Sequence, residues 1–280
     1  VLVLPLEGLS MESASLKLEV PPHDTKKATF NFRMDHPLEY EKFRSVVVNG
    51  KIRSEGEDRL TAELTVPVTI DRRHPCPQVA IEVDGDLGDW STEEEQFVEN
   101  STTYGASQQW QGLEDAGMRF RVGYDDKYLL FSGVVSDDNV VQSRDVVYIG
   151  IDTRAMGERL QQPRLGEQSY TIELSPNVKD PTESRVRIFP RRGRLQNQPE
   201  TKVAVRPTTK GYKFELAVAK SLIEDVQGKD WSDFQLNVVL RDVDEPQEKN
   251  AFVSWRPTPD ARNLNTNYAF FFRNDKAESK

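Results

Sequence analysis

The stretch Arg119–Ser136 reads RFRVGYDDKYLLFSGVVS and decides the fold class. Its two apolar runs, Arg119–Tyr124 and Tyr128–Ser136, are rich in valine and aromatic residues, which fit a pleated and half-buried surface. Between them, Asp125-Asp126-Lys127 has the polar composition of a turn. The stretch therefore predicts two neighbouring β-strands and not a helix, whose apolar residues would recur every three to four positions.

Runs of the same kind recur along the chain, each bounded by Gly, Pro, Asn or Asp. No long stretch has the apolar period of an amphipathic helix, and only Lys220–Asp225 has the pattern of a single helical turn. We therefore expect an all-β protein, an antiparallel β-sandwich of short strands. Besides the first pair, the expected strands are Val79–Val83, Asp145–Ile151, Ser169–Leu174, Arg185–Phe189, Tyr212–Val218, Phe234–Val243, Phe252–Trp255 and Tyr268–Phe272.

The length of 280 residues predicts two domains, since a domain typically has roughly 100–200 residues. Residues 1–70 are expected to form a small β-rich domain, with an immunoglobulin-like fold as one option and truncation as another. Charge and two prolines favour a linker over 71–78, and the sandwich then spans 79–280. Within it, 91–117 has the polar composition of a long surface connection. The strands of the first domain are expected within Ala14–Val20, Thr29–Arg33, Ser45–Asn49 and Leu60–Ile70.

The chain is acidic, with 37 Lys and Arg against 46 Asp and Glu and a net charge of −9. Nucleic acid and anionic membrane surfaces are therefore poor partners. No apolar run approaches the roughly 18 residues that cross a bilayer. Cys76 is the one cysteine, which excludes an internal disulfide and a multi-cysteine zinc site. The one basic cluster, Arg191-Arg192-Gly193-Arg194, favours a solvated hairpin tip over a phosphate site.

Several short motifs follow one another over residues 79–273. They are Val83–Trp90 (VDGDLGDW), Tyr124–Phe131, Ser136–Asp138, Ser143–Asp152, Gly211–Val218, Phe234–Asp244 and Ser254-Trp255. In their order the chain resembles the family 9 carbohydrate-binding modules. The resemblance implies a non-catalytic sandwich that binds an oligo- or polysaccharide, within a larger exported protein at an extracellular or periplasmic location. It leaves the sugar and the oligomeric state open.

The first of these motifs has a physical interpretation of its own. Asp84-Gly85 is a tight-turn pair, because glycine accepts the positive φ that such turns need. Trp90 is expected to anchor the core, since its indole buries a large apolar area. Trp231, between Asp230 and Ser232, is expected at an edge or in the core.

The resemblance also implies where sugar is held, because two tryptophans of the family clamp the ring. One matches Trp255, which is followed by Arg256, and either ligand binding or core packing suits it. The other should fall near Val141-Gln142, where no aromatic stands, and Tyr148 replaces an acidic residue of the family. Trp110 and Tyr104 in the 91–117 connection are candidates to replace the missing clamp. The predicted ligand-binding residues are therefore Trp255, Trp110, Tyr104 and Arg256.

Acidic turns make calcium the one metal expected, because hard cations take several carboxylate and carbonyl oxygens. The candidate ligands are Asp84, Asp86, Asp242 and Asp244. The three histidines, His23, His36 and His74, all precede the expected sandwich, so a His-dependent triad, a His-rich zinc site and haem are not expected within it.

Two alternatives to a sugar-binding module stay open. One is a structural or adhesion sandwich whose sugar slot has degenerated. The other is an accessory domain of a glycoside hydrolase. Catalysis by this chain itself would need two carboxylates facing each other across a cleft. The acidic pairs Asp125-Asp126 and Asp137-Asp138 lie on turns, where carboxylates are usually solvated or bind calcium.

Overall fold

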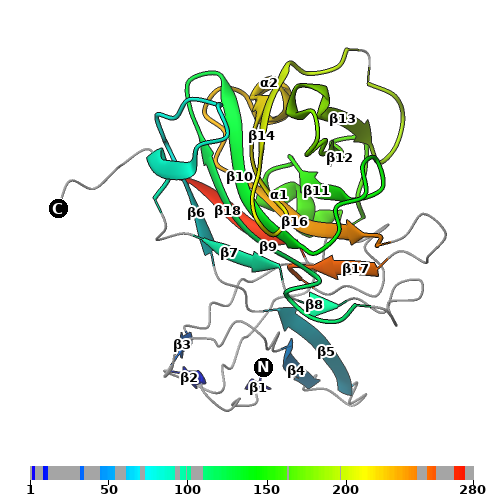
Figure 1. Ribbon diagram of the computed structural model, residues 1–280. Helices are drawn as coiled ribbons and strands as arrows, with labels where there is room; N and C mark the ends of the chain where they lie inside the picture. The colour runs from blue at the N-terminus through cyan, green and yellow to red at the C-terminus, as the bar shows by residue number, and fades with distance from the viewer. Residues whose placement is uncertain are drawn as a thin grey trace. The chain divides into compact units, whose positions relative to one another are not determined.

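A computed structural model of the chain (Figure 1) describes residues 73–274 with gaps at 92–94, 99, 102–109, 163, 196, 245–250 and 257–267. Before residue 73 it describes five strands. The chain divides into two compact units, Val1–Arg72 and Arg73–Lys280. In the part of the chain that the structure describes, no helix is both long and apolar enough to cross a bilayer.

The first unit contains two small groups of antiparallel strands. One is a three-stranded sheet in the order β1 (Leu2–Val3), β4 (Ser45–Arg53) and β5 (Thr61–Thr69), and the other is β2 (Leu9–Met11) paired with β3 (Phe32–Met34). β4 and β5 coincide with the strands expected near Ser45–Asn49 and Leu60–Ile70. Ala14–Val20 lies outside the described residues, and an immunoglobulin-like fold stays a prediction.

The second unit is a β-sandwich of two sheets (Figure 1), as the sequence predicts. The five-stranded sheet has the order β14 (Thr201–Pro207), β15 (Tyr212–Ala219), β10 (Tyr128–Asp137), β9 (Ala116–Tyr124) and β7 (Gln96–Val98). The eight-stranded sheet has the order β13 (Arg185–Pro190), β12 (Ser169–Ser175), β11 (Val146–Asp152), β16 (Asp233–Asp242), β17 (Ala251–Ser254) and β8 (Asn100–Ser101), with β18 (Ala269–Asn274) on β16 and β6 (Arg73–Pro77) on β18.

The core lies between the facing sides of the two sheets. On β11, Val147, Ile149 and Ile151 are buried there, while Tyr148 between them points to the other face, as the two-residue period of a strand requires. Each fully buried large apolar side chain contributes about 1.5–3 kcal/mol. Trp231 is in this core with its ring edge-on to Tyr124, their centroids 5.3 Å apart.

The hairpin of β9 and β10 forms as its sequence predicts. Asp125 Oδ1 accepts hydrogen bonds from the backbone N–H groups of Lys127 and Tyr128, at 2.6 and 2.7 Å. This side-chain turn leaves the two strands in register from Leu129 opposite Tyr124 to Asp137 opposite Ala116.

The VDGDLGDW motif is held by a carboxylate from β15. Glu215 is buried and accepts hydrogen bonds from Gly85 N at 2.7 Å and from Trp90 Nε1 at 2.8 Å. Gly85 has a φ of 81°, which confirms the expected tight turn. Trp90 packs against Tyr128 on the outer side of the five-stranded sheet, which confirms it as a core anchor.

Some elements differ from the sequence-based prediction. Val79–Val83 forms no strand; its alternating apolar residues cover the outer side of the five-stranded sheet without joining a ladder. The stretch 71–78, expected as a linker, contains β6, which pairs parallel with β18. The expected connection 91–117 contains β7 and β8.

In the described part of the chain two α-helices lie between strands, besides two short 3-10 helices, η1 (Leu87–Asp89) and η3 (Pro181–Glu183). α2 (Ser221–Gln227) extends the expected helical turn at Lys220–Asp225, whereas α1 (Met156–Gln161) was not anticipated. The edge strand β14 was also missed, because most of its residues are at least partly exposed and its pattern is weak.

Candidate functional site

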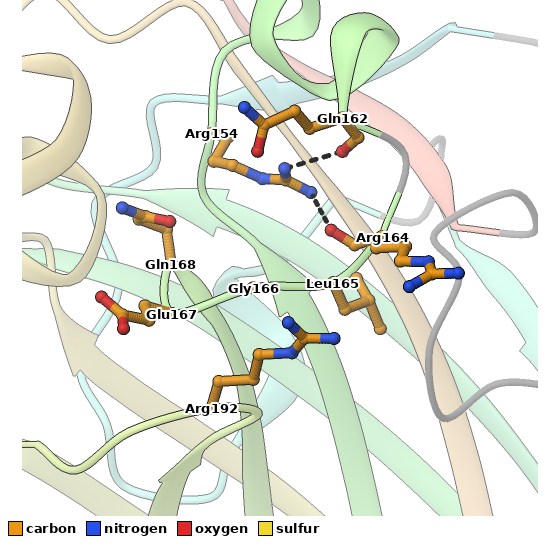
Figure 2. A pocket seen from close by; sticks show the side chains of 8 residues that line it. All are labelled: Arg154, Gln162, Arg164, Leu165, Gly166, Glu167, Gln168 and Arg192. Carbon is orange, nitrogen blue, oxygen red and sulfur yellow. Dashed lines mark hydrogen bonds between the residues drawn. The ribbon is translucent and has the colours of Figure 1, made fainter.

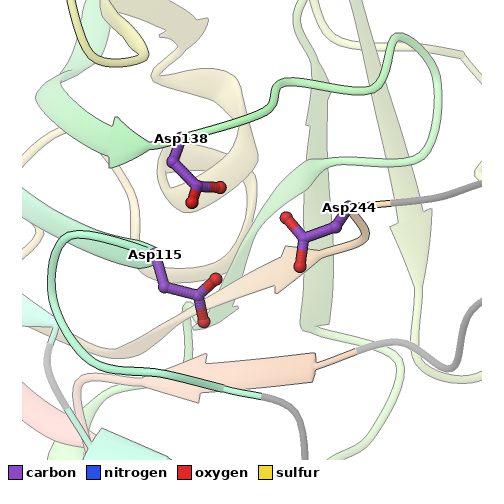
Figure 3. Close-up of side chains that lie close together, drawn as sticks. All are labelled: Asp115, Asp138 and Asp244. Atoms are coloured by element: carbon purple, nitrogen blue, oxygen red, sulfur yellow. The ribbon is translucent and has the colours of Figure 1, made fainter.

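Six aspartates gather where strands of both sheets begin or end. They form an inner triad, Asp137, Asp145 and Asp242, and an outer triad, Asp115, Asp138 and Asp244. Within each triad, one carboxylate oxygen of every residue lies within 4.8 Å of the others. The carboxylates of the outer triad face one another (Figure 3).

The inner triad is buried, with relative exposures of 2% for Asp137, 0% for Asp145 and 2% for Asp242. Asp137 Oδ1 accepts a hydrogen bond from Asn139 N at 2.9 Å, and Asp145 Oδ2 accepts one from Val141 N. The other oxygens, Asp137 Oδ2, Asp145 Oδ1 and Asp242 Oδ1, are buried without a hydrogen-bond partner among the described residues. A buried carboxylate oxygen without a partner is costly, so a positive group bound at these oxygens would stabilise the triad.

Burial raises the pKa of all three carboxyls of the inner triad. Burial, followed by repulsion from Asp145, raises the pKa of Asp137 to about 7. Burial also raises the pKa of Asp145 to about 7 and, with repulsion from Asp137, that of Asp242 to about 8. The Tyr212 hydroxyl is buried without a partner among the described residues, and burial and these three aspartates raise its pKa.

These residues fit a hard divalent cation such as calcium. Calcium takes six to eight oxygen ligands, and the inner triad offers three carboxylates whose free oxygens meet in a buried space. A cation there would neutralise the repulsion and satisfy the free oxygens. The outer triad is more open, with Asp138 exposed, and Asp115 Oδ2 already accepts a hydrogen bond from Gln111 N at 2.5 Å.

The four predicted calcium ligands do not come together. Asp242 is in the inner triad and Asp244 in the outer one. Asp84 pairs with Arg206 at 2.9 Å, and Asp86 lies 3.4 Å from Lys213, which lowers the pKa of Asp86. These two carboxylates are paired with side-chain cations, which disfavours calcium at the VDGDLGDW turn.

Trp255 is not the exposed platform that the resemblance implies. Its indole is only 5% exposed and packs edge-on against Phe120 and His74, each with ring centroids 5.1 Å away. Arg256 is also buried and places its guanidinium 4.8 Å from the centroid of the indole. Trp255 therefore takes the core-packing alternative, because stacking on sugar requires an exposed ring face. His74 lies in β6 and thus inside the sandwich, which corrects the expectation that every histidine precedes it.

The other two predicted aromatic residues offer no exposed platform among the described residues. Trp110 is half-buried against the core, and its Nε1 donates to the carbonyl oxygen of Ala116 at 2.8 Å. Tyr104 lies outside the described residues.

The outer face of the eight-stranded sheet brings together the ring of Tyr148 and the guanidinium of Arg241, a pair that the sequence does not predict. Tyr148 on β11 is half-buried, and the Arg241 guanidinium of β16 lies 5.7 Å from its ring centroid. Phe252 on β17 is paired in register with Arg241, and Glu173 on β12 is paired with Tyr148. The signal for this site in the sequence is Tyr148 itself, which stands where the resemblance implies an acidic residue.

No protein-family model matches the chain, and no curated protein does. Among solved structures, the chain is similar to a family 9 carbohydrate-binding module from Caldicellulosiruptor kristjanssonii in complex with cellotriose, with a TM-score of 0.55 and 12% identity over 74% of this chain and 96% of that one. A structure of a family 9 module from the same organism in complex with glucose gives a TM-score of 0.50 and 12% identity over 75% of this chain and 99% of that one. The second unit thus has the fold of these modules.

Proposed function

We propose that residues 73–280 form a non-catalytic carbohydrate-binding module whose ligand is an oligo- or polysaccharide. The observation that carries the proposal is the fold, which spans 96% of a module that binds cellotriose. In this proposal the module is part of a larger carbohydrate-active protein. Because the module would encounter polysaccharides outside the cytoplasm, the proposed location is extracellular or periplasmic.

The outer face around Tyr148 is the ligand surface in this proposal. A sugar ring has weakly polarised C–H faces and a rim of hydroxyls, so it needs an aromatic ring with polar groups beside it. Tyr148 supplies the ring, Arg241 supplies donors, and Glu173 supplies an acceptor on the neighbouring strand. Trp255 has no part in this surface, since its indole is buried.

Two aspartates of the inner triad lie at the ends of the strands that carry this surface. Asp145 directly precedes β11, which carries Tyr148, and Asp242 directly follows Arg241 on β16. Arg241 also donates from Nε to the carbonyl oxygen of Arg144 at 2.6 Å. A calcium ion held by the triad would fix the start of β11 and the end of β16, and so the spacing of Tyr148 and Arg241.

A pair of substitutions tests the ligand surface. Tyr148→Ala removes the ring and should weaken binding of cellotriose by at least about fivefold, or about 1 kcal/mol. Tyr148→Phe keeps the ring face and should retain most of the affinity. Calorimetric titration measures both, and thermal melts verify that the variants are folded. Equal affinity of the parent and a folded Tyr148→Ala would remove this surface from the proposal.

One observation favours a second candidate, a structural or adhesion module with a degenerate sugar slot. Trp255 is buried, and no aromatic stands at Val141-Gln142, so neither clamp tryptophan of the family is available as an exposed ring. A glycan array separates the two functions. The folded chain should bind at least one glycan if it is a carbohydrate-binding module, and none if the slot has degenerated.

A further inference from the structure

A polar cavity of about 530 Å³ opens between residues of the connection from α1 to β12 and the connection from β13 to β14 (Figure 2). It lies in the size range of pockets that bind small ligands, about 300–1,000 Å³. Leu165 forms an apolar part of its wall. The polar side chains around it are Arg154, Gln162, Arg164, Glu167, Gln168 and Arg192.

Arg154 builds this cavity and is not free to bind a ligand charge. Its Nε and one terminal nitrogen bond both carboxylate oxygens of Asp152, at 3.0 and 2.6 Å. It also donates to the carbonyl oxygens of Gln162 and Arg164, at 2.8 and 3.0 Å (Figure 2). Asp152 neutralises its charge, and Arg154 fixes the backbone from which the Gln162 and Arg164 side chains project.

The positive charges that are available to bind a ligand are those of Arg164 and Arg192. Both side chains are exposed, and among the described residues neither guanidinium has a hydrogen bond or an ion pair. Glu167 is the one acid among the lining residues, which leaves an excess of positive charge once Arg154 is paired with Asp152. Although the chain has a net charge of −9, two unpaired guanidinium groups at one cavity make a local positive charge that attracts an anionic ligand.

We propose that this cavity binds the carboxylate of a uronic-acid residue in an acidic saccharide; the inference rests on the proposed carbohydrate-binding function. A guanidinium matches a carboxylate with two parallel hydrogen bonds, which makes arginine the residue suited to this group. Gln162 and Gln168 carry amides that donate to and accept from sugar hydroxyls. Arg192 then has a binding function within the basic run Arg191-Arg192-Gly193-Arg194. The run lies in the connection from β13 to β14 in the other sheet and not at the hairpin tip that the sequence predicts.

The full-length chain is titrated calorimetrically with three probes: trigalacturonate, cellotriose and inorganic sulfate. Trigalacturonate should bind, and Arg164→Gln and Arg192→Gln should each weaken it at least tenfold. The matched control is Arg194→Gln, an exposed arginine of the same β13–β14 connection outside the cavity lining, which should stay within about twofold of the parent. Trigalacturonate binding should also weaken with salt, since exposed charges are screened beyond about 10 Å at 0.1 M and beyond about 3 Å at 1 M.

Three results would overturn the inference. The first is that trigalacturonate does not bind, and the second is that Arg194→Gln loses as much affinity for it as Arg164→Gln and Arg192→Gln do. The third is that sulfate binds as tightly as trigalacturonate and loses as much affinity in Arg192→Gln, which would make the cavity a general oxyanion site. Cellotriose separates this failure from that of the proposed function. If cellotriose binds with unchanged affinity in all three arginine variants while trigalacturonate does not bind, the proposed carbohydrate-binding function is supported and the uronate site is refuted.

Discussion

Removal of divalent cations should destabilise the second unit at neutral and alkaline pH. The reason is the inner triad, whose free oxygens are buried together. Raising the pKa of Asp145 from 3.8 to about 7 costs about 4 kcal/mol once the carboxyl is ionised and without a cation, at about 1.4 kcal/mol for each pH unit. Asp137 and Asp242 add costs of similar order, although three interacting carboxyls titrate as one cluster and the costs do not simply add.

The sign of the pH dependence follows from the direction of these pKa values. Each carboxyl has a higher pKa in the folded than in the unfolded state, so its contribution to stability is fully present below about pH 4 and is lost as the pH rises through about 7 to 8. A cation reverses this loss because it binds the ionised triad. At one hundred times the dissociation constant, binding adds about 2.7 kcal/mol. For a unit of this size, that amounts to a rise of about 5–11 °C in melting temperature.

Thermal melts of the full chain at pH 5 and pH 8, with calcium or with a chelator, measure this effect. Chelation should lower the melting temperature at pH 8 and have a much smaller effect at pH 5. Asp145→Asn should abolish the calcium dependence, whereas the control Asp84→Asn should keep it, because Asp84 pairs with Arg206. If calcium and chelator give the same melting temperature at pH 8, the triad does not hold a cation and the reasoning fails.

Two further predictions concern the residues that the fold buries. Trp255→Ala should cost about 3–5 kcal/mol in the free energy of unfolding, as for a large core side chain; a denaturant titration that finds an unchanged midpoint would return Trp255 to the surface. Glu215→Gln keeps the shape but removes the charge that accepts from Gly85 and Trp90, and should cost about 1.5–3 kcal/mol. The loss should be much smaller in a Trp90→Phe background, and an equal loss there would mean that Glu215 acts elsewhere.

Elements whose structure depends on residues a few positions apart could be predicted from the sequence. The Asp125 turn, the strands beside it and the positive φ of Gly85 all depend on neighbours in the chain. β6 was missed because Pro75 and Pro77 read as a linker, while the strand is stabilised by β18 from the other end of the unit. Segments that join a sheet through such distant pairing leave little local pattern.

The inner triad could not be predicted as a cluster from the sequence for the same reason, because it depends on pairing between distant strands. Asp137 and Asp145 are close in sequence, but Asp242 joins them only because β11 and β16 pair with Val146 opposite Arg241. A shift of one residue in that register would turn Asp242 to the opposite face. The burial of Trp255 could not be predicted for a related reason, since Phe120 and His74 that enclose it come from distant strands.

The two sites proposed for opposite charges are electrostatically independent because β11 separates them. Asp145 precedes the strand, and Asp152, which neutralises Arg154 of the arginine cavity, ends it. The strand has 7 residues, and at about 3.3 Å for each residue its ends lie roughly 20 Å apart. At that distance two unit charges interact by about 0.8 kcal/mol even at an effective dielectric constant of about 20, and the water and ions around the exposed Arg164 and Arg192 reduce this further. Charge at the triad therefore has little effect on Arg164 and Arg192, and a treatment that abolishes both calcium and uronate binding acts on the fold that they share.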